Sequence, residues 1–85
     1  MNVSRPEQRV LHALAQGGYI RHRRDGHGRV SEVLCFTREG YVLSNCTIEI
    51  FKSLRRKRLI ESRASGPYRI SQTGRCSVRA QPDNR

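Results

Sequence analysis

The chain has 85 residues, of which 35% are hydrophobic and none is Trp. A chain of this length forms one small domain, which buries roughly 60–65% of its unfolded surface on folding. Seventeen Lys and Arg against seven Asp and Glu give a net charge of +10. The composition excludes a membrane-spanning helix, because no apolar run approaches ~18–20 residues. It favours a polyanionic partner, nucleic acid or an acidic protein surface, over a basic surface that is merely solvated.

The first helix is predicted over residues 5–16. Ser4 and Glu7 have the spacing of a capping box, in which each side chain accepts a hydrogen bond from the other residue's backbone N–H. Apolar residues then recur on one helical face: Val10, Leu11 and Leu14. Gly17 and the glycine after it end the helix, because glycine adopts the left-handed C-terminal conformation at little cost.

A β-hairpin is predicted from residues 19–24 and 30–36, because the turn between them begins with Asp25 and contains two glycines. Alternate residues of its first strand share one face: Tyr19, Arg21 and Arg23. The alternation of the second strand is imperfect, so we expect both faces of the hairpin to be partly covered. Residues 41–43 follow another turn and are predicted as a third short strand.

The second helix is predicted to begin after an N-cap at Asn45 or Thr47, the best candidates, and to end in the basic run at Arg58. Its apolar positions face one way: Ile50, Phe51 and Leu54. Its cations gather in the last turn, where positive charge also suits the helix dipole. A helix of this kind presents a basic surface to a partner.

A second strand pair follows, over residues 59–60 and 68–70, with residues 71–74 closing it. The order helix, β-hairpin, helix, β-hairpin predicts an α+β, winged-helix-like fold in which the second hairpin is the wing. We predict one domain over residues 1–80 and a polar tail over residues 81–85. Strands replace the support helix that normally seats the recognition helix on DNA, which weakens the prediction of a DNA reader.

Two separate basic elements, the end of the second helix and the first hairpin, supply most of the candidate partner-binding residues. Arg suits this role because its planar guanidinium pairs bidentately with phosphate or carboxylate. Two arginines of the wing are expected to be exposed and complete the set. The candidates are Lys52, Arg55, Arg56, Lys57, Arg58, Arg21, Arg23, Arg24, Arg29, Arg63 and Arg69.

The sequence predicts no catalytic, metal or cofactor site. The three histidines lack ligand spacing. The three cysteines are predicted to be small buried hydrophobes in a reduced, cytoplasmic protein, because their number is odd, no CxxC occurs, and polar residues follow Met1. Cys46 lies near a helix start, where a thiol pKa can fall, but no nucleophile–base pattern accompanies it. We therefore predict a binding protein and not an enzyme.

Short segments spread along almost the whole chain match one family: Ser4-Arg5-Pro6-Glu7-Gln8-Arg9, Arg38-Glu39-Gly40, Cys46-Thr47, Pro67-Tyr68-Arg69-Ile70 and Val78-Arg79-Ala80-Gln81. They resemble the YjhX-type family of small bacterial proteins. The resemblance implies a toxin that inhibits DNA topoisomerase I by binding it, with an acetyltransferase-like antitoxin as partner. It assigns a role to no individual residue. The alternative is a winged-helix regulator that binds duplex DNA through residues 52–58 and the wing.

Overall fold

Helices alternate with groups of two or three strands along the chain in a computed structural model that describes residues 3–44, 46–64 and 66–79. Within these ranges there are three helices and five strands. In chain order they are α1 (Arg5–Ala15), β1 (Tyr19–Arg24), β2 (Val30–Phe36), β3 (Val42–Leu43), α2 (Ile48–Arg56), β4 (Ile60–Ser62), β5 (Tyr68–Ile70) and α3 (Gln72–Arg79). The α+β class and the predicted order of the first two helices and the hairpins are confirmed. The predicted N-cap Asn45 and the predicted tail over residues 81–85 lie outside the described residues.

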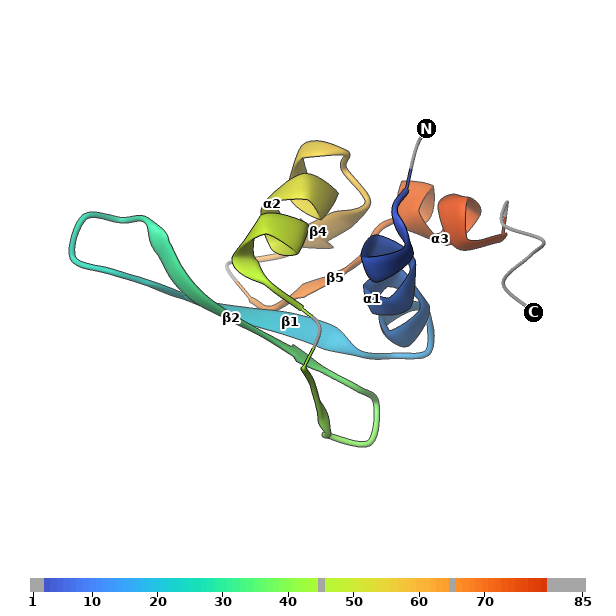
Figure 1. The fold of residues 1–85 in the computed structure, drawn as a ribbon, viewed down its shortest axis with the longest axis horizontal. Helices are drawn as coiled ribbons and strands as arrows, with labels where there is room; N and C mark the ends of the chain where they lie inside the picture. Colours follow the sequence, from blue (N-terminus) through green and yellow to red (C-terminus); the bar gives the residue numbers. More distant parts are fainter. Residues whose placement is uncertain (1–2, 45, 65, 80–85) are drawn as a thin grey trace.

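The two predicted hairpins join into one antiparallel sheet with the strand order β3-β2-β1-β5-β4. The connection between them is the pairing of Ile20 in β1 with Tyr68 in β5. Figure 1 shows the three helices of the described chain on one side of this sheet. The helices cover one face of the first hairpin, and on its other face Tyr19 and Phe36 are half-buried while Arg21 is exposed. The winged-helix arrangement itself stays a prediction.

The capping box of α1 forms as predicted. The Ser4 backbone N–H donates to Glu7 Oε1 at 2.8 Å, and the Glu7 N–H donates to Ser4 Oγ at 3.3 Å. The helix ends at Ala15 with Gln16 as its C-cap, and Gly17 follows with a φ of +108°. Local sequence signals therefore determine both ends of this helix.

The hydrophobic core lies between the helices and the covered face of the sheet. Its fully buried side chains come from α1, β1, β2, α2 and the residue before β4: Val10, Leu11, Leu14, Ile20, Cys35, Phe51, Leu54 and Leu59. Burying one large side chain of this kind contributes roughly 1.5–3 kcal/mol. The core fixes the orientation of α2, so that the polar face of this helix points away from the sheet.

Helix α2 is shorter than predicted and ends in a left-handed residue. Thr47 is its N-cap, and its hydroxyl accepts from the Ile50 N–H at 3.2 Å. At the other end, the Arg58 N–H donates to the Arg55 carbonyl and the Leu59 N–H donates to the Leu54 carbonyl. This is the Schellman pattern, in which the left-handed position is usually glycine. Arg58 occupies that position with a φ of 60°.

Helix α3 was not predicted, because residues 71–74 were expected only to close the wing. The Ser71 hydroxyl accepts from the Gly74 N–H at 3.0 Å and donates to the Arg58 carbonyl at 2.7 Å. Ser71 therefore both begins α3 and fastens it to the end of α2. Gly74 lies against the Leu59 carbonyl oxygen, and a Cβ added at this glycine would lie 2.7 Å from Ile70 Cγ1. Only a glycine at this position allows α3 to pack this closely against Leu59 and Ile70.

A candidate partner-binding surface

Four of the five predicted cations at the end of α2 are exposed: Lys52, Arg55, Arg56 and Arg58. Because Phe51 and Leu54 of the same helix are fully buried, the helical period turns the cations outward. In the described part of the chain no carboxylate lies within ion-pair distance of any of the four. We call these four residues the α2 cluster.

Lys57 differs from its neighbours, because its ammonium is engaged inside the protein. Its Nζ lies 3.0 Å from Oε1 and 3.1 Å from Oε2 of Glu7 on α1. The Ser53 hydroxyl donates to Glu7 Oε2 at 2.5 Å, so two residues one turn apart on α2 hold one carboxylate. Glu7 is 4% exposed, which makes this a nearly buried link between the helices. Sequence reasoning identified Glu7 only as a capping residue and counted Lys57 among the partner-facing cations.

The pKa of Glu7 reflects two opposed effects. Burial raises the pKa of its carboxyl group, whereas the hydrogen bonds from Ser53 and the Ser4 backbone, together with Lys57, lower it. The stabilising contacts prevail and lower the pKa from 4.5 to about 2. Glu7 is therefore ionised at neutral pH and neutralises Lys57.

The hairpin of β1 and β2 carries a second group of cations. Its turn extends beyond the helices (Figure 1). Arg21 and Arg23 lie on one face of β1, and Arg24 lies on the other. Arg23 is 3.8 Å from Glu32, and the Arg24 Nη1 donates to the Gly28 carbonyl at 2.7 Å.

The turn of this hairpin is built on Asp25. The Asp25 carboxylate accepts from the His27 N–H at 2.8 Å and from the Arg29 N–H at 3.0 Å. Arg29 is exposed at the tip of the hairpin. The predicted hairpin-turn chemistry is thus confirmed, and it places this arginine away from the core.

Around His22, the structure brings the α2 cluster close to the helix-facing side of the hairpin. The His22 ring stacks on Phe51 with centroids 5.8 Å apart and meets Tyr68 edge-on at 5.4 Å. The guanidinium carbon of Arg55 lies over the Phe51 ring, 5.6 Å from its centroid. Burial, followed by the positive charges of Arg24 and Arg55, lowers the pKa of His22. The imidazole is therefore neutral at pH 7.

The two predicted wing arginines are exposed but lie apart. Arg63 follows β4 and is 3.8 Å from Glu61. Arg69 lies on the sheet face opposite the helices, with its guanidinium carbon 5.4 Å from the Tyr19 ring centroid. The candidate residues thus divide between a helix-side group around α2 and a group on the uncovered sheet face.

Sequence reasoning missed the apolar part of the uncovered sheet face. Tyr19 stacks on Phe36 with ring centroids 5.2 Å apart, and Leu34 and Val42 are exposed on neighbouring positions. We call this surface the open face; its members are Tyr19, Arg21, Arg23, Leu34, Phe36, Val42 and Arg69. The alternation within β1 and β2 was the available signal, but it does not say which face the helices cover.

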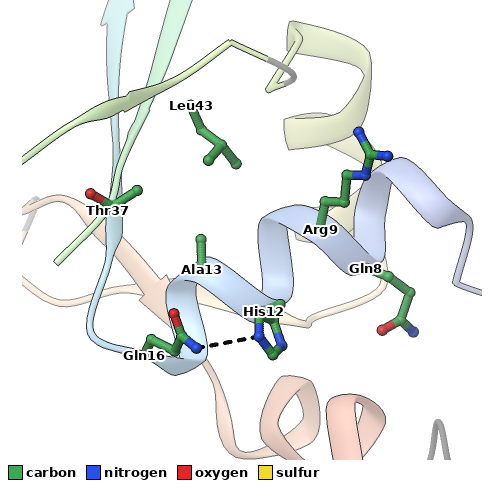
Figure 2. Close-up of a pocket in the computed structure, with 7 residues that line it drawn as sticks. All are labelled: Gln8, Arg9, His12, Ala13, Gln16, Thr37 and Leu43. Atoms are coloured by element: carbon green, nitrogen blue, oxygen red, sulfur yellow. Dashed lines mark hydrogen bonds between the residues drawn. The ribbon is translucent and has the colours of Figure 1, made fainter. Parts of the chain in front are cut away.

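A hollow of about 450 Å³ lies between α1 and the strands β2 and β3 (Figure 2). It is lined by Gln8, Arg9, His12, Ala13, Gln16, Thr37 and Leu43. The Nε2 atoms of His12 and Gln16 are 3.3 Å apart, and Figure 2 shows both side chains at one end of the hollow. In the described ranges, no group of three or more His, Cys, Asp or Glu side chains could hold a metal ion.

The cysteines correct two expectations. Cys35 and Cys46 are buried as predicted, but Cys76 on α3 is exposed. Cys46 was the candidate for a lowered thiol pKa. Its contact with the Cys35 thiol and its burial instead raise the pKa of Cys46, so this thiol is a weak nucleophile at neutral pH.

Comparison with known proteins gives the family. A model described as "Putative toxin of bacterial toxin-antitoxin pair" matches residues 1–85. The chain belongs to the YjhX toxin family. The resemblance drawn from the sequence segments is therefore confirmed, and family membership implies an antitoxin partner.

Relatives match the chain over 93% or more of their own length. The chain is 71% identical to a UPF0386 protein of Beijerinckia indica and 69% identical to one of Brucella anthropi, with all of each chain covered. It is 53% identical to a UPF0386 protein of Aliivibrio fischeri, again over both complete chains. No solved structure matches the chain significantly. Among the described residues, no helix combines the length and apolar character that crossing a membrane requires.

Proposed function

We propose that this YjhX-family protein is a non-catalytic inhibitor that binds a bacterial type I DNA topoisomerase through its Arg-rich surfaces. The observation that carries the proposal is the α2 cluster, four exposed cations within two helical turns that have no carboxylate partner among the described residues. Uncompensated charge at this density costs stability through self-repulsion. Such a surface is accounted for when an anionic partner covers it.

The backbone of Arg58 supports a binding role for this cluster. A non-glycine residue in the left-handed conformation costs about 1–2 kcal/mol. At this helix end a glycine would satisfy the same hydrogen bonds without that cost, and the chain has Arg instead. Strain of this kind is retained where the side chain serves a function.

The contact we propose is between the α2 cluster and an acidic patch on the enzyme. Arg guanidinium groups pair bidentately with carboxylates. The positive charges of Arg24 and Arg55 both lower the pKa of His22, so the basic surface of α2 continues onto the hairpin. Competition for DNA next to the enzyme is the second physical route. An acetyltransferase-like antitoxin, which the family resemblance implies, would relieve inhibition by covering the same surface.

A plasmid-relaxation assay tests the proposal. The protein is titrated into purified bacterial topoisomerase I and supercoiled plasmid, and its fold is verified by circular dichroism. We expect relaxation to slow as the protein reaches molar equivalence with the enzyme. Unchanged relaxation at a hundredfold excess of folded protein would remove the proposal.

A winged-helix DNA-binding regulator is the second candidate, favoured by the exposed cations of α2 beside the β4–β5 hairpin. Binding to an unrelated DNA duplex is measured while the salt concentration is raised. Each phosphate contact contributes about −0.9 to the log–log slope of affinity against salt. Absence of duplex binding at low salt would eliminate this candidate without affecting the first.

A further inference from the structure

The open face contains a continuous row of side chains across four strands. The row runs from Val42 in β3 through Phe36 in β2 and Tyr19 in β1 to Arg69 in β5. The planes of the Tyr19 and Phe36 rings are inclined to each other by 23°. Both residues are half-buried, so each ring keeps part of its surface in solvent. Aromatic rings on a sheet face without covering helices are a platform on which flat ligands can stack.

Two of the three exposed large hydrophobic side chains of the described chain lie on this face. They are Leu34, which is 38% exposed, and Val42, which is 52% exposed. Exposed apolar groups gathered beside polar ones mark binding surfaces in soluble proteins. The apolar row therefore indicates a ligand with a hydrophobic component.

Positive charge frames the apolar row. Glu32 is 3.8 Å from Arg23, and Glu61 in β4 is 3.8 Å from Arg63. Each carboxylate partly neutralises the charge of its arginine. In the described part of the chain neither Arg21 nor Arg69 has a carboxylate within ion-pair distance. A ligand on this face must therefore combine an anionic backbone with flat apolar groups.

We propose that the open face binds single-stranded nucleic acid, with bases stacking on Tyr19 and Phe36 and phosphates pairing with Arg21 and Arg69. Unpaired bases offer exposed π-faces, and stacking on aromatic side chains is the usual mode by which sheet surfaces hold single strands. This role is independent of the topoisomerase proposal, which uses the opposite side of the molecule.

A hollow beside the row supports the assignment. Its volume is about 410 Å³, and it lies between β1 and the turn at Pro67. Arg21, Arg23, Leu34 and Phe36 line it together with His22, Glu32 and Gly66. Ligand sites of roughly 300–1,000 Å³ hold small molecules, so this hollow has room for one nucleotide next to the stacked bases.

Duplex DNA fits this face less well, because its bases are stacked inside the helix and out of reach of Tyr19 and Phe36. An acidic protein segment would use the arginines and leave the rings without a role. The two rings therefore distinguish single strands from both alternatives, and the experiment is built on them.

The experiment measures fluorescence anisotropy of a labelled 12-nucleotide DNA strand, the corresponding RNA, and the DNA duplex, each titrated with the full chain at 50 mM salt. We expect both single strands to bind tighter than the duplex. Tyr19→Leu and Phe36→Leu should each weaken single-strand binding about tenfold, because base stacking on one ring is worth roughly that factor or more. Tyr19→Phe, which keeps the ring, should bind like the native protein.

Tyr41→Leu is the matched control, since Tyr41 is exposed but outside the row, and it should leave the affinity unchanged. Circular dichroism verifies the fold of each variant, and the Phe36→Leu protein carries the test if Tyr19→Leu fails to fold. Equal affinity for duplex and single strand, or undiminished binding by folded Phe36→Leu, would overturn the proposal. So would equal displacement of the strand from native and Tyr19→Leu protein by polyglutamate, which would show a general polyanion site.

Discussion

Replacing Glu7 with Gln should destabilise the protein more than any other substitution of a single carboxylate among the described residues. The amide keeps the size of the side chain but removes the negative charge that faces Lys57 Nζ at 3.0 Å. It also places an NH₂ group where the Ser53 hydroxyl now donates. The substitution therefore acts on the contact between α1 and α2 and leaves the core intact.

The magnitude follows from the pKa of Glu7. The difference between 4.5 and about 2 corresponds to roughly 3 kcal/mol of preference for the ionised form in the folded protein. Lys57 is 25% exposed, so its ammonium can recover some hydration after the substitution. We therefore expect the free energy of unfolding to fall by about 2 kcal/mol, a large share of the stability of so small a domain.

Urea unfolding followed by circular dichroism measures the change, with Glu39→Gln as the matched control at an exposed site. The folded pKa of Glu7 is lowered, so its contribution is present above pH 4.5 and is lost as the pH falls toward 2. Over that window the native protein should lose more stability than Glu7→Gln. A surface substitution usually changes the free energy of unfolding by less than about 0.5 kcal/mol. If Glu7→Gln lowers the free energy of unfolding at pH 7 by no more than that, the proposed link between the helices is refuted.

Three further predictions concern the α2 terminus, α3 and His22. Arg58→Gly should raise the free energy of unfolding by roughly 0.5–1 kcal/mol, because glycine adopts the left-handed conformation without strain. Arg56→Gly, which lies within the helix, should lower the free energy of unfolding. Urea unfolding midpoints at pH 7 measure both changes. Gly74→Ala should cost about 2 kcal/mol or more, because its Cβ meets the Leu59 carbonyl oxygen, while Gly26→Ala, with open space around it, should be nearly neutral in the same assay. The pKa of His22 is lowered below 6.5, so the folded state takes up the proton less readily than the unfolded chain and stability should fall as the pH drops below about 6.5; an unchanged decline in His22→Phe would contradict this.

Elements with local sequence signals were predicted well. The Ser4 and Glu7 pair defined the start of α1, the turn at Asp25 defined the first hairpin, and the apolar spacing of α2 defined its buried face. In each case the decisive interactions join residues close together in the sequence. The exposure of the α2 cluster followed from the same spacing.

Features that depend on distant residues were not predicted. The pairing of Ile20 with Tyr68 makes one sheet from two hairpins, and no local pattern indicates it. Helix α3 contains Gly, Thr, Cys and Ser, which are weak helix formers, so its stability comes from packing and from the Ser71 cap. The engagement of Lys57 by Glu7 spans 50 residues and converts a predicted partner-facing cation into a structural one.

The most direct test of the account is calorimetric titration of the protein into purified bacterial topoisomerase I without DNA. The native protein is compared with Arg55→Glu/Arg56→Glu and with Arg5→Glu/Arg9→Glu, which makes the same change in charge on exposed positions of α1. We predict that the native protein and the α1 variant bind, and that reversal on α2 abolishes binding while the circular dichroism spectrum is unchanged. Equal affinity for all three proteins, or no binding by the native protein, would contradict the assignment of the α2 cluster as the enzyme-binding surface.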